Sequence, residues 1–215
     1  MTVKLFKKSV ETIIWDWNGT LLNDLELCVE SINSLLANRN LAPLTPKKYR
    51  EVFTFPVKDY YEKAGFDFAK EDFAIPAHEF IDLYNSKVKN CSLHQNVIPI
   101  LEQFKINGIN QFILSATKQD NLEETLKHNS IFDFFEGVVG LNDHYAVSKI
   151  ERGEQLISGN KIVKETSVII GDTIHDFEVA KELGIDCILI ANGHQSKQRL
   201  KSTGALVLNS INELL

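Results

Sequence analysis

Asp16 stands where a short apolar run ends and a turn begins. Residues 12–15 are β-branched or aromatic, which favours a buried strand, and Asn18-Gly19 is typical of a turn. Because open α/β sheets bind ligands outside the carboxyl ends of their strands, a carboxylate here can act as a nucleophile or as a metal ligand. The hydroxyl of Thr20 follows in the same turn. The alternative is a capped turn in which Asp16 and Asn18 bond only their own backbone.

Four more residues with useful chemistry follow apolar runs later in the chain, namely Ser115, Lys149, Asp172 and Asp176. Each has an ordinary interpretation: Ser115 as a loop hydroxyl, Lys149 as a solvated charge, and the two aspartates as caps of the helix that follows them. In this order and together with Asp16, they form the set that phosphoryl transfer requires, because that reaction needs a nucleophile, charge neutralisation and positioning.

Phosphoryl transfer gives each of these side chains a role. Asp16 is predicted to attack phosphorus and to form an aspartyl-phosphate. Ser115 is predicted to donate a hydrogen bond to a phosphoryl oxygen, and Lys149 to add positive charge beside the transferring group. The predicted cofactor is Mg²⁺, a hard cation that takes oxygen ligands. Asp16 and Asp172 would each supply a carboxylate ligand, and Asn18 would supply its backbone carbonyl. Asp176 would hold the outer shell.

The elements that position these residues follow from periodicity. From residue 98 onward, apolar strands alternate with amphipathic helices, which predicts right-handed crossovers and a parallel, doubly wound α/β sheet. Residues 24–94 show helical spacing and no convincing strand. We therefore predict a core and an inserted helical cap, formed by residues 1–22 with 95–215 and by residues 23–94. The two connections between them are predicted to act as hinges.

These stretches resemble the motifs of the haloacid dehalogenase superfamily. Residues 13–21, Ile-Ile-Trp-Asp-Trp-Asn-Gly-Thr-Leu, are similar to motif I, and residues 171–176, Gly-Asp-Thr-Ile-His-Asp, to motif IV. Residues 177–185 and 204–215 resemble phosphoglycolate-phosphatase-like members, so the similarity covers nearly the whole chain. Motifs II and III are single residues, Ser115 and Lys149, and they match the family by their order along the chain.

The resemblance implies a Rossmann-like parallel sheet core with an α-helical cap of the C1 type. It also implies a phosphatase-type hydrolase that acts on a small phosphorylated metabolite. A substrate-specificity loop is expected near residues 55–58 of the cap, where Lys58 is the best candidate for binding an anion. The implied catalytic residues are Asp16, Asn18, Ser115 and Lys149, and the implied substrate contacts are Lys58, Ser115, Ala116 and Lys149.

Position 18 departs from the family pattern, because the family carries a second aspartate where this chain has Asn18. That aspartate protonates the leaving oxygen and then helps to activate water. An amide has no titratable proton, so we expect slow turnover of alkyl phosphates and better turnover of aryl or acyl phosphates. Asp24 and His175 are candidates to replace the missing acid. On this basis, Asn18→Asp is expected to raise the turnover of an alkyl phosphate at least about tenfold.

Other functions stay open at this point. The main alternative is a catalytically weak or inactive relative that binds a phosphorylated ligand or a protein partner. Another is cleavage of a phosphonate or a halide, which would need other cap residues. A receiver domain also combines aspartates, a hydroxyl and a lysine on a doubly wound sheet, but its length and its acidic pair differ from those of this chain.

Composition narrows the expected partners and compartment. The 215 residues carry a net charge of −6 and 44% hydrophobic residues, which is ordinary for a globular protein and argues against general nucleic-acid binding. No stretch approaches the length of a membrane span, and residues 1–9 lack the apolar core of a signal peptide. Three widely spaced cysteines indicate a reducing compartment. We expect a cytoplasmic protein, monomeric or homodimeric, without nucleic-acid or membrane partners.

Overall fold

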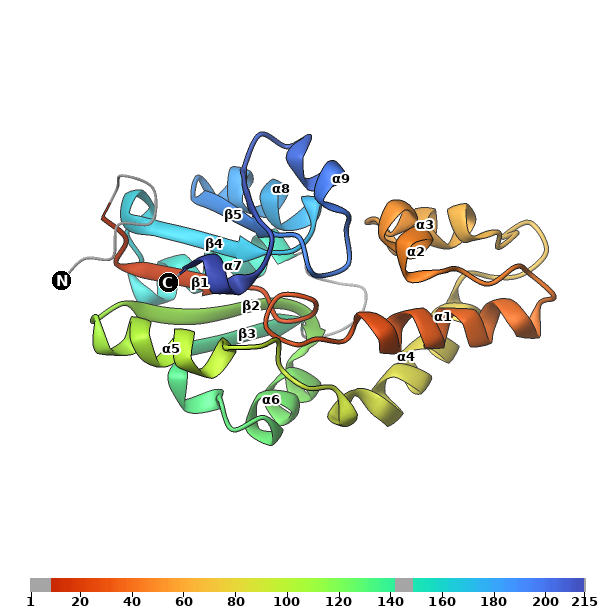
Figure 1. The fold of residues 1–215 in the computed structure, drawn as a ribbon, viewed down its shortest axis with the longest axis horizontal. Coiled ribbons are helices and arrows are strands. Elements are labelled where there is room, and N and C mark those ends of the chain that lie inside the picture. Colours follow the sequence, from red (N-terminus) through yellow and green to blue (C-terminus); the bar gives the residue numbers. More distant parts are fainter. Residues whose placement is uncertain (1–8, 142–148, 215) are drawn as a thin grey trace.

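The computed structural model describes residues 9–141 and 149–214 of the chain. Residues 1–8, the start of the predicted core segment, lie outside this description. Six parallel strands form one sheet in the order β3-β2-β1-β4-β5-β6 (Figure 1). The bounds are β1 (Thr12–Trp15), β2 (Asn110–Lys118), β3 (Gly137–Leu141), β4 (Ser167–Gly171), β5 (Asp186–Ile190) and β6 (Leu206–Leu208). The predicted α/β class with a Rossmann-like parallel sheet is confirmed.

Strand β1 lies at the centre of the sheet and is buried on both faces. Its neighbours are β2 on one side and β4 on the other, with Ile14 opposite Phe112 and Ile169. Ile13 and Trp15 pack into one hydrophobic cluster, and Ile14 packs into another, as the alternation of side chains along a strand requires. A strand buried on both faces reads as a continuous apolar run, which is why residues 12–15 could be recognised as a strand.

Helices cover both faces of the sheet. One face carries α5 (Val97–Ile106) and α6 (Gln119–His128), and the other carries α7 (Lys149–Asn160) and α8 (Ile174–Leu183). The short helix α9 (Lys197–Lys201) connects β5 to β6. Single turns of 3₁₀ helix lie at Val88–Asn90, Phe132–Phe134, Lys164–Thr166 and Ile211–Leu214. This alternation matches the pattern expected from residue 98 onward.

Four further helices lie to one side of the sheet, beyond the carboxyl ends of its strands (Figure 1). They are α1 (Leu25–Asn38), α2 (Pro46–Val52), α3 (Val57–Ala64) and α4 (Ala74–Lys87), and they pack around a hydrophobic cluster of their own. The Thr45 hydroxyl caps α2 by accepting from the Lys48 amide, and Gly65 ends α3 in a left-handed conformation. Helix α4 begins at Ala74, because Pro76 is tolerated only in a first turn.

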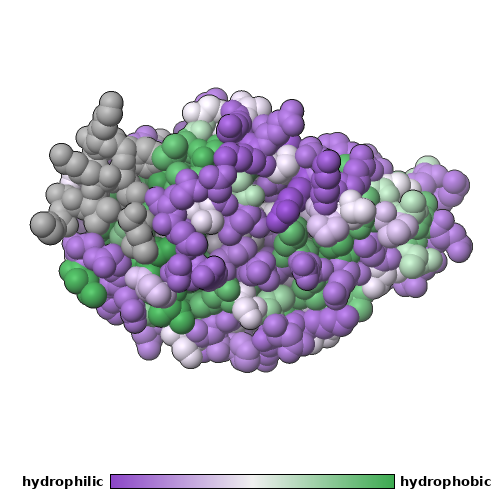
Figure 2. All heavy atoms as spheres, in the orientation of Figure 1, coloured by the Kyte–Doolittle hydropathy of each residue, from purple (hydrophilic) through white to green (hydrophobic). Residues whose placement is uncertain are grey.

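The molecular surface agrees with the composition. Hydrophilic residues cover most of the face shown in Figure 2, with smaller hydrophobic areas between them. Within residues 9–141 and 149–214, no helix combines the length and the apolar character that crossing a membrane requires.

Candidate active site

The carboxyl ends of the central strands bring most of the predicted site residues together. Asp16 follows β1 directly, and its amide donates to the carbonyl oxygen of Ile170 in β4 at 2.8 Å. Asp172 follows β4, and Ser115 lies in β2, where its hydroxyl accepts from the Thr117 amide at 3.1 Å. All three predicted site residues are buried. Parallel strands end at the same edge of a sheet, so residues far apart in the sequence meet there.

Lys149, the first residue of α7, connects two of these carboxylates. Its Nζ lies 2.6 Å from Asp16 Oδ1 and 2.6 Å from Asp176 Oδ1. Burial lowers the pKa of the Lys149 ammonium, but the two carboxylates outweigh burial and hold that pKa above its usual value. Lys149 is therefore a buried, charged side chain beside the predicted nucleophile and not a solvated surface lysine.

Asp176 is held rigidly at the beginning of α8. Its Oδ2 accepts from the amides of Asp172 and Thr173 at 3.2 and 3.0 Å and from the Thr173 hydroxyl at 2.7 Å. Thr173 and Asp176 form a capping box, so the capping interpretation of Asp176 is also correct. Burial acts to raise the pKa of Asp176, but Lys149 and these hydrogen bonds lower it below its usual value.

Asp172 faces the loop that follows β1. Its Oδ1 accepts from the Thr20 hydroxyl at 3.0 Å, and its Oδ2 accepts from the His194 amide at 2.6 Å. The approach is so close that a Cβ at Gly19 would stand 2.8 Å from Asp172 Cγ, and Gly19 has a φ of +73°. Only glycine fits at this point of the turn.

The three aspartates form a donor set that suits a hard divalent cation. Carboxylate oxygens of Asp16, Asp172 and Asp176 all lie within 4.8 Å of one another, and Lys149 compensates part of their charge. Burial raises the pKa of Asp16 to about 8 and that of Asp172 to about 6; neighbouring carboxylates add to the rise, whereas Lys149 opposes it at Asp16. Oxygen ligands with an excess of negative charge fit Mg²⁺.

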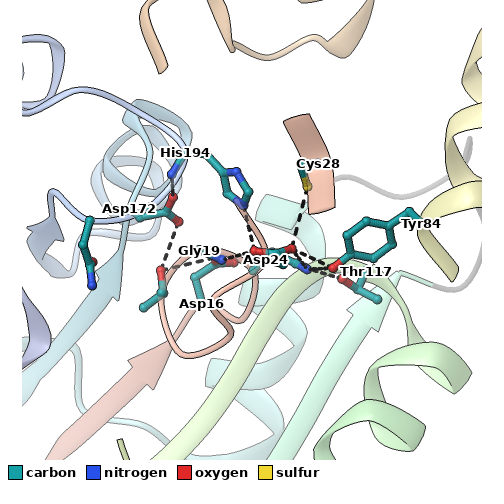
Figure 3. Close-up of polar contacts among 12 residues, drawn as sticks. Asp16, Gly19, Asp24, Cys28, Tyr84, Thr117, Asp172 and His194 are labelled. Carbon is teal, nitrogen blue, oxygen red and sulfur yellow. Dashed lines mark hydrogen bonds and ion pairs between the residues drawn. The ribbon is translucent and has the colours of Figure 1, made fainter. Parts of the chain in front are cut away.

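The side chain of Asn18 points away from this carboxylate cluster. Its amide nitrogen donates to Asp24 Oδ2 at 2.9 Å and to the Tyr84 hydroxyl at 2.6 Å. Its amide oxygen accepts from the Thr117 hydroxyl at 2.6 Å. Figure 3 shows this second polar network, which is centred on Asp24 and lies beside the carboxylates. Tyr84 and Thr117 were not predicted as site residues from the sequence, because Tyr84 lies inside a predicted helix and Thr117, at the end of a predicted strand, matches no motif.

Asp24 and His194 form a buried ion pair in the second network. The distance from His194 Nε2 to Asp24 Oδ1 is 3.1 Å, and the Tyr49 hydroxyl lies 3.2 Å from His194 Nδ1. Burial lowers the pKa of His194, but Asp24 outweighs burial and raises that pKa to about 9. Of the two acids considered from the sequence, Asp24 contacts Asn18, whereas the His175 ring lies against the Phe55 ring, with the centroids 4.7 Å apart.

The predicted substrate contacts outside the carboxylate cluster lie on the surface. Ala116 is exposed next to Ser115 in β2. Lys58 is exposed on α3, and its Nζ lies 5.7 Å from the centroid of the Phe68 ring. This contact turns the ammonium toward another residue of the four-helix segment, so a role for Lys58 in substrate binding stays a prediction.

Two arginines connect the four-helix segment to the loop after β5. Arg50 of α2 donates to the carbonyl oxygens of Gly193 and Asn192 at 2.9 and 3.1 Å. Arg199 of α9 donates in the opposite direction, to the carbonyl oxygens of Arg50 and Phe53 at 2.9 and 2.5 Å. This reciprocal contact holds the four helices against the edge of the sheet where the site lies.

Known proteins are similar to this chain over most of its length. Residues 13–190 match the family described as haloacid dehalogenase-like hydrolase. The phosphoglycolate phosphatase of Caulobacter vibrioides is 25% identical over 209 residues, which cover 93% of this chain and 86% of that protein. The phosphoglycolate phosphatase of Synechococcus elongatus is 20% identical, with 89% and 88% covered. A haloacid dehalogenase-like hydrolase from Bacteroides fragilis shares the fold, with a TM-score of 0.83, 17% identity, and 96% and 100% covered.

Proposed function

We propose that this chain, which belongs to the haloacid dehalogenase-like hydrolase family, is a Mg²⁺-dependent phosphatase-type hydrolase of a small phosphorylated metabolite. The observation that carries the proposal is the meeting of Asp16, Lys149, Asp172 and Asp176 at the carboxyl edge of the sheet. The four-helix segment, residues 23–94, would be the cap that covers the substrate.

Asp16 would act as the nucleophile. Its carboxylate oxygen would attack phosphorus, the bond from phosphorus to the leaving oxygen would break, and an aspartyl-phosphate would form. Lys149, 2.6 Å from Asp16 Oδ1, would stabilise negative charge that develops on the phosphoryl oxygens, and Ser115 would donate a hydrogen bond to one of them. Water would then attack phosphorus, releasing phosphate and restoring the Asp16 carboxylate.

Mg²⁺ would be held by the carboxylates of Asp16 and Asp172 and by the backbone carbonyl of Asn18. Asp176 would orient Lys149 and the outer shell, a role that its four hydrogen bonds suit. When bound, the cation supplies charge neutralisation for the transferring group.

The test is release of inorganic phosphate from a panel of phosphorylated metabolites, with and without Mg²⁺. We expect turnover that requires Mg²⁺ and that is abolished by Asp16→Asn, because an amide is not a nucleophile of this kind. A panel without turnover, including aryl phosphates, would contradict the proposal.

A second candidate function is favoured by Asn18, which leaves the site without the family's usual acid. The chain would then be a catalytically inactive relative that binds a phosphorylated ligand or a protein partner. Mg²⁺-dependent binding of inorganic phosphate without turnover of any ester would support this candidate over the first.

A further inference from the structure

The side chain of Asn18 uses its donors and its acceptor in hydrogen bonds to three residues. Asparagine offers two N–H donors and one carbonyl acceptor. Both donors are engaged, by Asp24 and by Tyr84, and the carbonyl accepts from Thr117. The amide therefore joins the loop after β1 to helix α4 and to strand β2. Figure 3 shows Tyr84 and Thr117 on the same side of Asp24.

Asp24 needs donors on both of its oxygens. Its Oδ1 accepts from the Gly19 amide at 2.9 Å and from His194, and its Oδ2 accepts from Asn18 and from the Tyr84 hydroxyl at 2.6 Å. Asp24 has an exposed fraction of 0%, so bulk water cannot replace a lost donor. A buried carboxylate without its donors is strongly destabilising.

We propose that Asp24 is a positioning residue of the active site and that it is the reason position 18 carries an amide. Asp24 lies at the start of α1, and Asn18 lies two residues after Asp16. For its effect on the reaction, this inference rests on the proposed phosphatase function. Its effect on folding is independent of that function.

The hydrogen-bond directions predict that the amide at position 18 and the carboxylate at position 24 can be exchanged only together. In Asn18→Asp/Asp24→Asn, the amide at position 24 donates to the carboxylate at position 18, and its oxygen accepts from Gly19 and His194. The new carboxylate accepts from the hydroxyls of Thr117 and Tyr84. The hydrogen-bonded neighbours stay the same, and the directions of the three hydrogen bonds that join positions 18 and 24 and the Tyr84 hydroxyl are all reversed.

Each single exchange breaks this pattern. Asn18→Asp sets two acceptors against each other at a distance that is now a 2.9 Å hydrogen bond. In Asp24→Asn, the new amide has only one oxygen. It can accept either from Asn18 or from Gly19 and His194, but not from both. The gain expected for Asn18→Asp from the sequence alone should therefore require the second exchange.

The first measurement is a thermal double-mutant cycle. Wild type, Asn18→Asp, Asp24→Asn and the double variant are melted with and without Mg²⁺, with Asp120→Asn as the control. Asp120 has an exposed side chain, at 85%, and lies outside the site. We expect each single exchange to lower the Tm, the double variant to recover at least half of the combined loss, and the control to match the wild type.

The second measurement compares p-nitrophenyl phosphate, an aryl ester, with glycerol 3-phosphate, an alkyl ester. We expect the double variant to raise the alkyl-to-aryl ratio of kcat at least about tenfold over wild type, because position 18 then carries a titratable carboxyl group in place of an amide, which has no proton to give to the leaving oxygen. Asn18→Asp alone should not raise it. A purely structural role of Asp24 would restore the Tm without changing this ratio.

The outcomes separate the two proposals. Additive Tm shifts, an Asn18→Asp variant as stable as wild type, or a double variant that does not fold would each overturn the pairing. A recovered Tm with an unchanged ratio would overturn the positioning role in catalysis. A recovered Tm in proteins that release no phosphate from either ester or from the metabolite panel would keep the pairing and remove the proposed function.

Discussion

Lys149 and its two carboxylates show how single residues set the chemistry of this site. The ammonium lies between Asp16 and Asp176 at equal distances of 2.6 Å, and all three side chains are buried. When ionised, the two carboxylates exceed the single ammonium in charge, and Asp172 adds to this excess. The stability of the folded protein therefore depends on the positive charges beside these carboxylates.

Removing the ammonium should destabilise the protein. Lys149→Ala leaves the carboxylates of Asp16 and Asp176 buried without their partner, and breaking a buried pair in this way typically costs about 3–5 kcal/mol. We expect denaturant unfolding to show a loss of that order and turnover to be abolished. The matched control is Lys164→Ala, which removes an exposed lysine outside the site. Equal losses in both variants would contradict the assigned role.

Mg²⁺ should stabilise the wild-type protein by neutralising the same carboxylates. A ligand at 100 times its Kd adds about 2.7 kcal/mol, which corresponds to roughly 5–10 °C in Tm for a domain of this size. Asp172→Asn should remove most of this shift, because it takes one carboxylate from the donor set. Melting curves at increasing Mg²⁺ concentration measure both effects. A Tm that does not respond to millimolar Mg²⁺ in the wild type would refute the metal site.

At the scale of elements, the four-helix segment and the sheet meet through loops that make both hydrogen bonds and aromatic contacts, such as those of Phe53 with His194 and of Phe55 with His175. Arg50 and Arg199 bind each other's segments, and Gln195 adds a hydrogen bond from its side chain to the Phe53 carbonyl at 3.0 Å. The predicted hinge motion of the cap would have to break these contacts.

Arg50→Ala should loosen this connection. It removes two hydrogen bonds from a charged donor, each typically worth about 1.5–3 kcal/mol. We expect hydrogen exchange in residues 192–196 to become at least about tenfold faster, which corresponds to about 1.4 kcal/mol. Lys48→Ala, an exposed substitution on the same helix, is the matched control. If both variants exchange at the wild-type rate, Arg50 does not hold the cap.

For the whole molecule, buried ion pairs link the fold to pH. His194 has a pKa of about 9 in the folded protein, against an ordinary value of 6.5. A group whose pKa is raised by folding stabilises the fold fully below its ordinary pKa, and this contribution is lost as the pH rises through the folded value. Asp16 and Asp172, also raised, add a loss of stability with rising pH when no cation is bound.

The wild-type protein in saturating Mg²⁺ should therefore lose stability between pH 6.5 and about 9. The loss from His194 is on the order of 3 kcal/mol, from about 1.4 kcal/mol for each pH unit between its two pKa values. His194→Gln keeps a donor for Asp24 but cannot carry the charge, so its stability should fall less over this range. Urea unfolding at each pH measures the difference. Parallel curves for the two proteins would show that the ion pair does not control the pH dependence.

The sequence by itself determined the sheet and the carboxylate cluster. Apolar runs that end in a polar residue identify buried parallel strands, and all such strands end at one edge, so Asp16, Ser115 and Asp172 had to be close neighbours. The apolar spacing over residues 23–39 predicted the helix that the structure has at residues 25–38, and the helix at residues 174–183 was predicted to end at Gly184. These features depend on local pattern and on topology, both of which the order of residues contains.

Only the tertiary structure decided where the side chain of Asn18 points. Its partners Tyr84 and Thr117 are 66 and 99 residues away in the sequence, and no periodicity relates them. Asp24 is close in sequence, but its contact with Asn18 depends on the tight turn at Gly19 and on His194 from another loop. Such contacts arise from the packing of the four-helix segment against the sheet, because hydrogen bonds need positions correct to a few tenths of an ångström.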